Sequence, residues 1–272
     1  MPYRSLVLVL LALALSGCGG SQAPTATQPL AALSPTADRA AAPTAVPTSP
    51  PSTPTAAAKE VIDSSDVVQA PEGLNSYRSR LEIRLKGAQG ATPIDGRLIA
   101  AQERVKDPPA QRMALASEGQ LGDIGGAQTG DFELIQIGDQ AWLKVDGQWI
   151  SSSGVDPAQF DTGLMSPADL LADLRSARLV SSGELVSGVQ TNHYHFSKDD
   201  LAPGSALASA DEVSGDLWLS AEGGYVVQMT MTATGGHVLG EGGQNPFTGT
   251  VEFFYLLSDL NAPVVIEPPK GG

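Results

Sequence analysis

Hydrophobic and polar side chains alternate with a period of two along much of the chain. The clearest segment is "YRSRLEIRLKG" (residues 77–87), in which Tyr77, Leu81, Ile83 and Leu85 fall on one face. Four basic residues and Glu82 fall on the other face. A helix would scatter these charges around its axis. The alternation therefore predicts an antiparallel strand with one buried face and one solvated face.

Further strand-like segments follow at short intervals, separated by turn residues. Their sequences are "DGRLIAAQERV", "QRMALASEG", "DFELIQIGDQAWLKVDGQWI", "ARLVSSGEL", "VQTNHYHFSK", "GDLWLSAEGGYVVQMTMTATG" and "GTVEFFYLLSDL". Turns are predicted at 107–109, 138–139, 146–147 and 222–224, where Gly, Pro and Asp gather. The pattern predicts one antiparallel sheet of about nine to eleven strands, curled around whatever covers its apolar face.

Two stretches break the alternation and predict short helices. Residues 56–74 begin "AAAKEVIDSSDVV" and precede the first strand. Residues 166–177, "SPADLLADLRSA", place Ser166 as N-cap and Pro167 at the first helical position, with a narrow stripe of Leu170, Leu171 and Leu174. The fold class predicted is α+β, mainly antiparallel β.

The amino terminus has the pattern of an export signal. Residues 1–17 hold one basic residue, Arg4, then an apolar run too short to span a bilayer permanently. The run ends in Leu15-Ser16-Gly17-Cys18, which resembles the bacterial lipobox, where the cysteine is acylated and the chain is cut before it. The alternative is a chance cysteine near an ordinary cleavage site. Lipidation of Cys18, by palmitate or a similar acyl chain, predicts a lipoprotein on the extracytoplasmic side of the cell membrane.

A change of composition predicts the domain boundaries. Residues 18–58 are rich in Pro, Ala and Thr and nearly free of charge, so they predict an extended, disordered tether behind the lipidated cysteine. Residues 59–272 carry the alternating pattern and form the predicted globular domain. The tether would hold this domain away from the membrane.

Charge and cysteine content exclude several classes of function. The chain has 30 acidic and 16 basic residues, a net charge of -14, and no basic cluster, so nucleic acid is not expected as a partner. Cys18 is the one cysteine, so no disulfide forms within the chain. A monomer is expected.

The order of these segments resembles the LolA-like superfamily, and within it the lipoproteins of the LppX/LprA/LprF/LprG type. The resemblance covers residues 56–269 and rests on "SYRSRLEIRLKG", "IQIGDQAWLKVDGQW", "GVQTNHYHF", "GDLWLSAEGGYVVQMTM" and "YLLSDLNAPVVIEPP". It implies a curved half-barrel sheet with short helices on its concave face. It also implies an apolar cavity between sheet and helices that takes acyl chains of lipids or lipoproteins.

The resemblance and the alternation together give a candidate lining for that cavity. The residues are Leu81, Ile83, Leu85, Val227, Met229, Met231, Phe253 and Tyr255. On the last strand two sets remain open, one with Val251, Phe253, Tyr255 and Leu257, the other with Phe254 and Leu256. Flexible methionines beside phenylalanine suit an adaptable apolar surface. The alternative is an ordinary filled core, which periodicity does not distinguish from a hollow one.

Sites for catalysis or metals are not convincing. His193 and His195 share one face of a predicted strand, with His237 as a third possible ligand in a glycine-rich loop, but a solvated strand face is the preferred interpretation. The glycine runs lack the strand-before, helix-after context of phosphate loops, and no serine has a nucleophile-elbow sequence. No metal, cofactor or enzymatic activity is expected.

Two functions compete. The first is a membrane-anchored lipoprotein that binds or carries a lipid or lipidated molecule in the apolar cavity. The second is an envelope sensing or protein-interaction module with a filled core and no ligand cavity.

Overall fold

The computed structural model describes residues 58–68, 73–121, 132–145, 147–153, 167–205, 207–236 and 247–270. The chain divides into two compact units, Met1–Pro51 and Ser52–Gly272, and every described residue belongs to the second. The predicted signal peptide, Cys18 and nearly all of the predicted tether lie outside the described residues.

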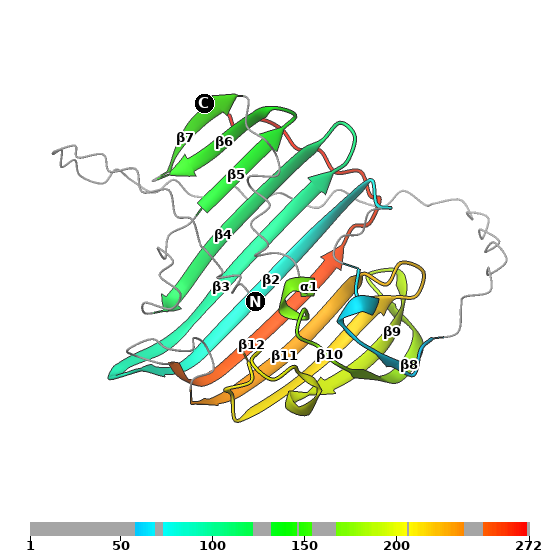
Figure 1. Cartoon of the computed structure of the whole chain (residues 1–272). Coiled ribbons are helices and arrows are strands. Elements are labelled where there is room, and N and C mark those ends of the chain that lie inside the picture. Colours follow the sequence, from blue (N-terminus) through cyan, green and yellow to red (C-terminus); the bar gives the residue numbers. More distant parts are fainter. Residues whose placement is uncertain are drawn as a thin grey trace, which may run out of the picture. The chain divides into compact units, whose positions relative to one another are not determined.

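Among the residues described in the second unit, twelve strands form one antiparallel sheet (Figure 1). Their order across the sheet is β1-β8-β9-β10-β11-β12-β2-β3-β4-β5-β6-β7. The strands are β1 (Val61–Ile62), β2 (Ser76–Gln89), β3 (Thr92–Val105), β4 (Ala110–Gln120), β5 (Phe132–Ile137), β6 (Gln140–Val145), β7 (Gln148–Ser153), β8 (Ala177–Val186), β9 (Val189–Ser197), β10 (Glu212–Ser220), β11 (Val226–Gly236) and β12 (Phe247–Ser258). Two meanders, β2 to β7 and β8 to β12, are joined where β12 pairs with β2.

The strand predictions are confirmed in position and pairing. Every segment predicted as a strand is one, and β5 turns into β6 at the expected Gly138, which has a positive φ of 58°. The mainly antiparallel β class is confirmed as well. The sheet has one strand more than the upper limit of the predicted range.

That additional strand is β1, and it replaces part of the helix predicted for residues 56–74. Within the described part of that segment, the ordered elements are β1 and a single 3₁₀ turn, η1 (Ser64–Asp66). The β-branched pair Val61 and Ile62 favours extended backbone. Asp63 then caps the short turn through its side chain, which accepts a hydrogen bond from the backbone N–H of Ser65 at 2.8 Å. The helix prediction is therefore wrong here.

The second predicted helix shrinks to one turn, α1 (Pro167–Leu170). Beyond it the backbone pairs with another segment. Leu174 bridges Leu201, and the N–H of Arg175 donates to the carbonyl of Asp200 at 2.8 Å. These strand-like bonds outweigh the local helix signals. The predicted N-cap Ser166 lies outside the described residues.

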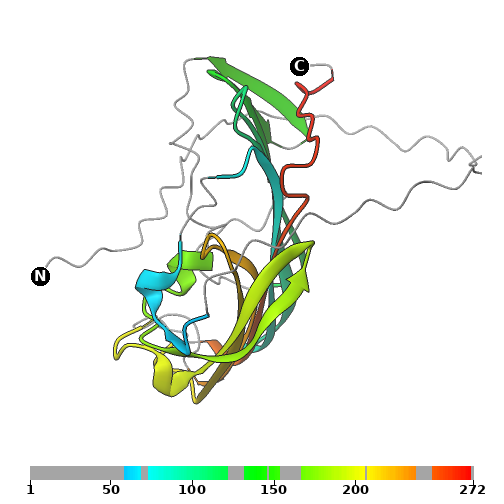
Figure 2. The same ribbon diagram turned by 90° about the vertical axis from the view of Figure 1, so that its right-hand side faces the viewer.

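The sheet is strongly curved, and Figure 2 shows β8 to β12 bending around the segments that connect the strands. Glycines at facing positions allow neighbouring backbones to come close. Gly87 on β2 opposes Gly249 on β12, and a Cβ on Gly87 would overlap the carbonyl oxygen of Thr248. Side chains are therefore excluded at this point, as is common where strands bend.

Candidate functional site: an apolar concave face

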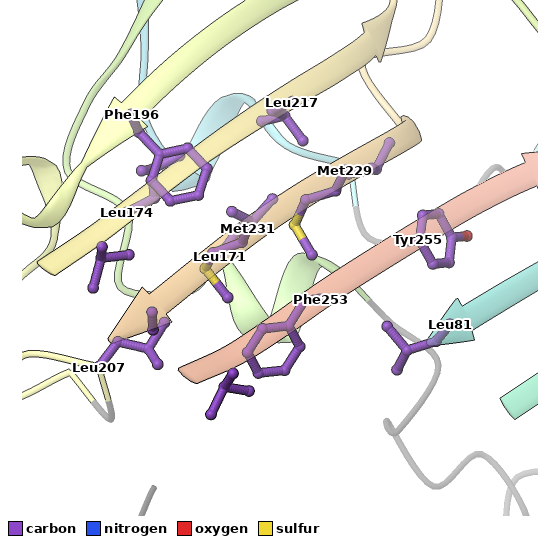
Figure 3. Packing of buried hydrophobic residues seen from close by; sticks show 14 of the residues in the cluster. Leu81, Leu171, Leu174, Phe196, Leu207, Leu217, Met229, Met231, Phe253 and Tyr255 are labelled. Atoms are coloured by element: carbon purple, nitrogen blue, oxygen red, sulfur yellow. The ribbon is translucent and has the colours of Figure 1, made fainter. Parts of the chain in front are cut away.

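The register of the strands brings the predicted site residues into rows on the concave face. In one row, Met229 opposes Tyr255, and Tyr255 opposes Leu81. The next row holds Met231, Phe253 and Ile83 in the same order, and Figure 3 shows both methionines beside the two aromatic rings. Leu85 joins the same face opposite Val251. Val227 is buried but lies at the register shift between β10 and β11, outside the core cluster that holds the other seven residues.

Most of these side chains are inaccessible to solvent. Seven of the eight are between 0% and 6% exposed, and Ile83 is half-buried. On β12 the alternative left open by the sequence is settled in favour of Val251, Phe253, Tyr255 and Leu257, which are all buried. Phe254 and Leu256 lie on the convex face and are half-buried. Within this group, burial raises the pKa of the Tyr255 hydroxyl well above its usual range.

Within the described residues, the concave face is covered by the segments that connect the strands and not by a layer of helices. The buried apolar side chains of this cover are Ile62, Val67, Leu171, Leu174, Leu201 and Leu207. Backbone hydrogen bonds hold the segments to one another: Ser64 N–H donates to the Leu174 carbonyl at 3.0 Å, and Ala202 N–H donates to the Asp173 carbonyl at 2.8 Å. Leu171 and Leu174 belong to the apolar stripe predicted for residues 166–177. The others lie in segments without a periodic signal.

The apolar face continues beyond the densely buried part. Ile83 opposes Leu98 on β3, and both side chains are half-buried and packed against the core. Leu115 on β4 belongs to the same set. A second, small cluster follows on β4 to β6, made of Met113, Leu134 and Ala141 with half-buried Phe132 against it. The alternation in residues 95–105 and 111–119 contained a signal for this continuation, but the predicted lining did not include these strands.

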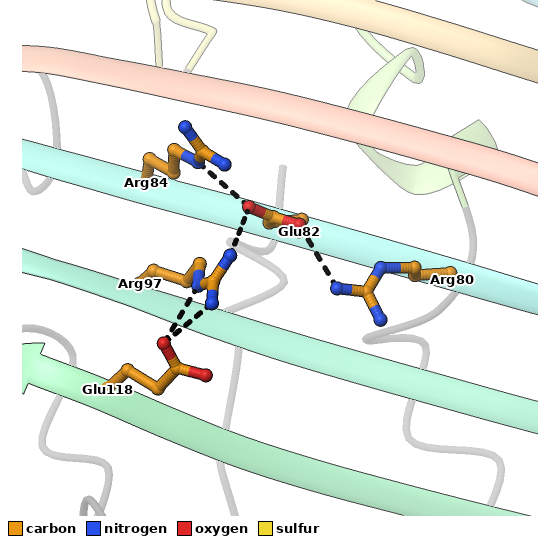
Figure 4. Close-up of polar contacts among 5 residues, drawn as sticks. All are labelled: Arg80, Glu82, Arg84, Arg97 and Glu118. Carbon is orange, nitrogen blue, oxygen red and sulfur yellow. Dashed lines mark hydrogen bonds and ion pairs between the residues drawn. The ribbon is translucent and has the colours of Figure 1, made fainter.

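The convex face carries an ionic cluster around Glu82 (Figure 4). The Nε of Arg84 donates to the carboxylate of Glu82 at 2.8 Å, and Arg80 and Arg97 donate to it at 3.2 and 3.3 Å. Arg97 also contacts Glu118 at 2.6 Å. These contacts, the one to Arg84 most of all, hold the pKa of the Glu82 carboxyl below its ordinary value.

Two surface pockets are also lined largely by convex-face residues. One, of about 380 Å³, lies between Arg84, Thr232 and Glu252. The other, of about 640 Å³, lies between Arg112, Trp149 and the carboxy-terminal segment 265–270. The first pocket also has Phe254 in its wall, and the second has Ile135 and Pro268, so both mix charged and apolar side chains.

The histidine pair lies on the convex face of β9, as the alternation indicated. His193 Nε2 and His195 Nδ1 lie 3.0 and 3.1 Å from the same oxygen of Asp216 on β10. The His193 ring stacks on Trp218 at 4.2 Å between centroids, and Trp218 donates to Glu184 at 2.7 Å. Among the described residues, no group of three or more His, Cys, Asp or Glu side chains is arranged to hold a metal ion. His237 lies outside them.

Comparison with known proteins gives limited information. No protein-family model matches the chain, and no curated protein matches its sequence. Among solved structures, LprF from Mycobacterium bovis matches with a TM-score of 0.39 and 14% identity, over 74% of this chain and 91% of that chain. A likeness this weak carries no functional argument. Within its described residues, no helix is long and apolar enough to cross a membrane.

Proposed function

We propose that this protein is a membrane-anchored extracytoplasmic lipoprotein whose concave face binds the acyl chains of a lipid or lipidated molecule. The observation that carries the proposal is the continuation of the buried core into half-buried Ile83, Leu98 and Leu115. Binding of an acyl chain to an apolar surface of this kind is favourable, because both apolar surfaces are removed from water. The lipobox-like sequence at Cys18 supports the anchor.

Methionines give this face a means of adapting to an entering chain. Met229 and Met231 are 0% and 3% exposed and lie next to Tyr255 and Phe253 on the neighbouring strand. Unbranched side chains change rotamer at small cost, so they can move aside for an acyl chain. The covering segments are short and irregular, and backbone hydrogen bonds such as those from Ser64 to Leu174 and from Val68 to Gly224 would have to open for their displacement.

The density of the core also favours a second candidate function. Val227, Met229 and Leu217 are each 0% exposed, which is what a filled core requires. In that case the domain is an envelope sensing or protein-interaction module that uses its surface. The two candidates differ in whether lipid is found in the isolated protein.

Native mass spectrometry of the full mature chain, extracted from membranes in mild detergent, tests the proposal. We expect co-purified lipid, and we expect Leu98→Gln to lower its occupancy roughly tenfold, because a glutamine amide in an apolar contact costs about 1–3 kcal/mol. Ile99→Gln is the matched control, since Ile99 is a half-buried neighbour on the opposite face of β3. Absence of lipid from the wild-type protein, or an equal effect of both variants, would favour the filled-core module.

A further inference from the structure

The two edges of the open sheet are built differently. At one edge, β1 covers only the first two residues of β8, Ala177 and Arg178. The rest of β8 is irregular, because its register with β9 shifts between Leu179 and Ser181 and again between Ser182 and Glu184. Bulges of this kind twist an edge strand and hinder its pairing with another chain.

The other edge, β7, has no such protection. Its six residues stay in register with β6 throughout, without a bulge, and Gln148–Ser153 includes no proline and no charged residue. Within the part of the chain that the structure describes, no strand pairs with the outer side of β7. A regular, uncharged edge is a template for a further strand.

Ile150 lies near the middle of β7, opposite Leu143 of β6, and its side chain is 58% exposed. Opposing residues of an antiparallel pair lie on the same face of the sheet. If β7 pairs antiparallel with an identical strand, a two-fold axis at Ile150 places each Ile150 against its counterpart. Trp149 then opposes Ser151, and Gln148 opposes Ser152. The pairing covers part of the exposed Ile150 side chain.

We propose that β7 is a self-association site, at which two copies of the chain pair antiparallel about Ile150 and join their sheets edge to edge. Two-fold pairing of identical strands is closed, so it yields a dimer and not a filament. The symmetry keeps the concave faces of both copies on the same side. The two Ile150 side chains then meet across the junction, and each lies beside Leu143 of its own copy.

Such a dimer is weak in free solution. Pairing of two six-residue strands buries less than the roughly 1,200 Å² of a stable interface. Confinement of copies to one membrane raises their effective concentration, which favours association without any new contact. The dimer is therefore expected on a membrane surface, and monomers are expected in dilute solution.

Cross-linking on liposomes tests this arrangement. The acylated mature chain carrying Ile150→Cys is reconstituted and treated with a short bis-maleimide. We expect covalent dimers in at least fivefold higher yield than for Ser152→Cys, whose two copies stand four residues apart along the paired strands. Leu185→Cys is the control for random collision, because Leu185 is 72% exposed on the opposite edge strand. A yield for Ile150→Cys no higher than for Leu185→Cys overturns the proposal.

A second measurement avoids the added cysteine. Energy transfer between labelled copies on liposomes is expected to fall to the level of random collisions in Ile150→Lys, because two like charges would meet at the axis. The unfolding midpoint of the variant must match that of the wild type. Unchanged energy transfer overturns the pairing. Lipid occupancy, measured separately, reports on the proposed ligand and not on this edge.

Discussion

At the scale of single residues, Glu82 shows how the convex face tolerates three neighbouring arginines. Its side chain is 11% exposed, while those of Arg80 and Arg84 are 47% and 58% exposed. The carboxylate lies near the middle of β2, one of the longest strands, and neutralises part of the positive charge of the three arginines. A buried acceptor for several guanidinium groups contributes more to stability than an isolated surface pair does.

We predict that Glu82→Gln lowers the free energy of unfolding at pH 7 by about 1–2 kcal/mol, because the arginines lose a charged acceptor while water screens part of the loss. Urea denaturation measures the change. The control is Glu252→Gln, an exposed carboxylate on the same face, for which we expect a change below about 0.5 kcal/mol. Equal losses in both variants would contradict the role given to Glu82.

The same contacts predict a pH dependence. The folded-state pKa of Glu82 lies below its ordinary value of 4.5, so its contribution is present above the unfolded-state pKa and is lost as pH falls through the folded-state pKa. The stability difference between wild type and Glu82→Gln should therefore shrink below about pH 4.5. A difference that stays constant between pH 7 and pH 3 would show that the carboxylate's charge does not matter.

At the scale of elements, β12 shows what the sequence could and could not decide. Its sequence predicted a strand but not which face is buried, because both faces carry large apolar side chains. Phe254 and Leu256 lie on one face, and Phe253 and Tyr255 lie on the other. The pairing with β2 settles the question, since Phe253 opposes Ile83 and Phe254 opposes Glu82. The charged partner identifies the convex face.

We predict that Phe253→Ala lowers the free energy of unfolding by about 3–5 kcal/mol, the usual cost of emptying a buried phenylalanine site. Phe254→Ala, its neighbour on the half-buried convex side, should cost about 1 kcal/mol. Chemical denaturation of both variants measures the two changes. The reverse order would mean that the register of β12 against β2 is shifted by one residue.

The limits of the sequence-based prediction follow from the range of the interactions involved. Strands and hairpin turns depend on neighbours a few positions apart, so alternation and Gly-containing turns located them. The first helix prediction was wrong and the second was confirmed for one turn only, because long-range backbone bonds, such as that from Ser64 to Leu174, compete with local helix signals. The candidate lining was found from one face of three strands, but its cover at Leu201 and Leu207 has no periodic signal. The bulges that distinguish β8 from β7 are also invisible in the sequence.

At the scale of the whole molecule, the proposed function combines the domain with the tether and the acyl anchor. About 40 residues of extended polyproline backbone at ~3.1 Å each would reach on the order of 120 Å, and a relaxed coil several-fold less. That reach would let the domain approach ligands or other copies while it stays attached to the membrane. Binding on the concave face and pairing at β7 would then both occur near the surface that holds the anchor.

We predict that the chain from residue 18 carrying Cys18→Ser, exported behind an ordinary cleavable signal, is released from the membrane, because an acyl chain contributes about 0.8 kcal/mol per buried CH₂ and the variant offers no thiol to acylate. Ultracentrifugation of cell fractions measures the distribution, and intact mass spectrometry of the wild-type protein should show a mass increase of the size of attached acyl chains. Ser16→Ala is a suitable control, since it keeps the cysteine and a small residue before the cut. The unfolding midpoint of the domain should be the same in all three proteins. Cys18→Ser protein that still sediments with membranes would show that another part of the molecule holds it there, and the tether would then not set its reach.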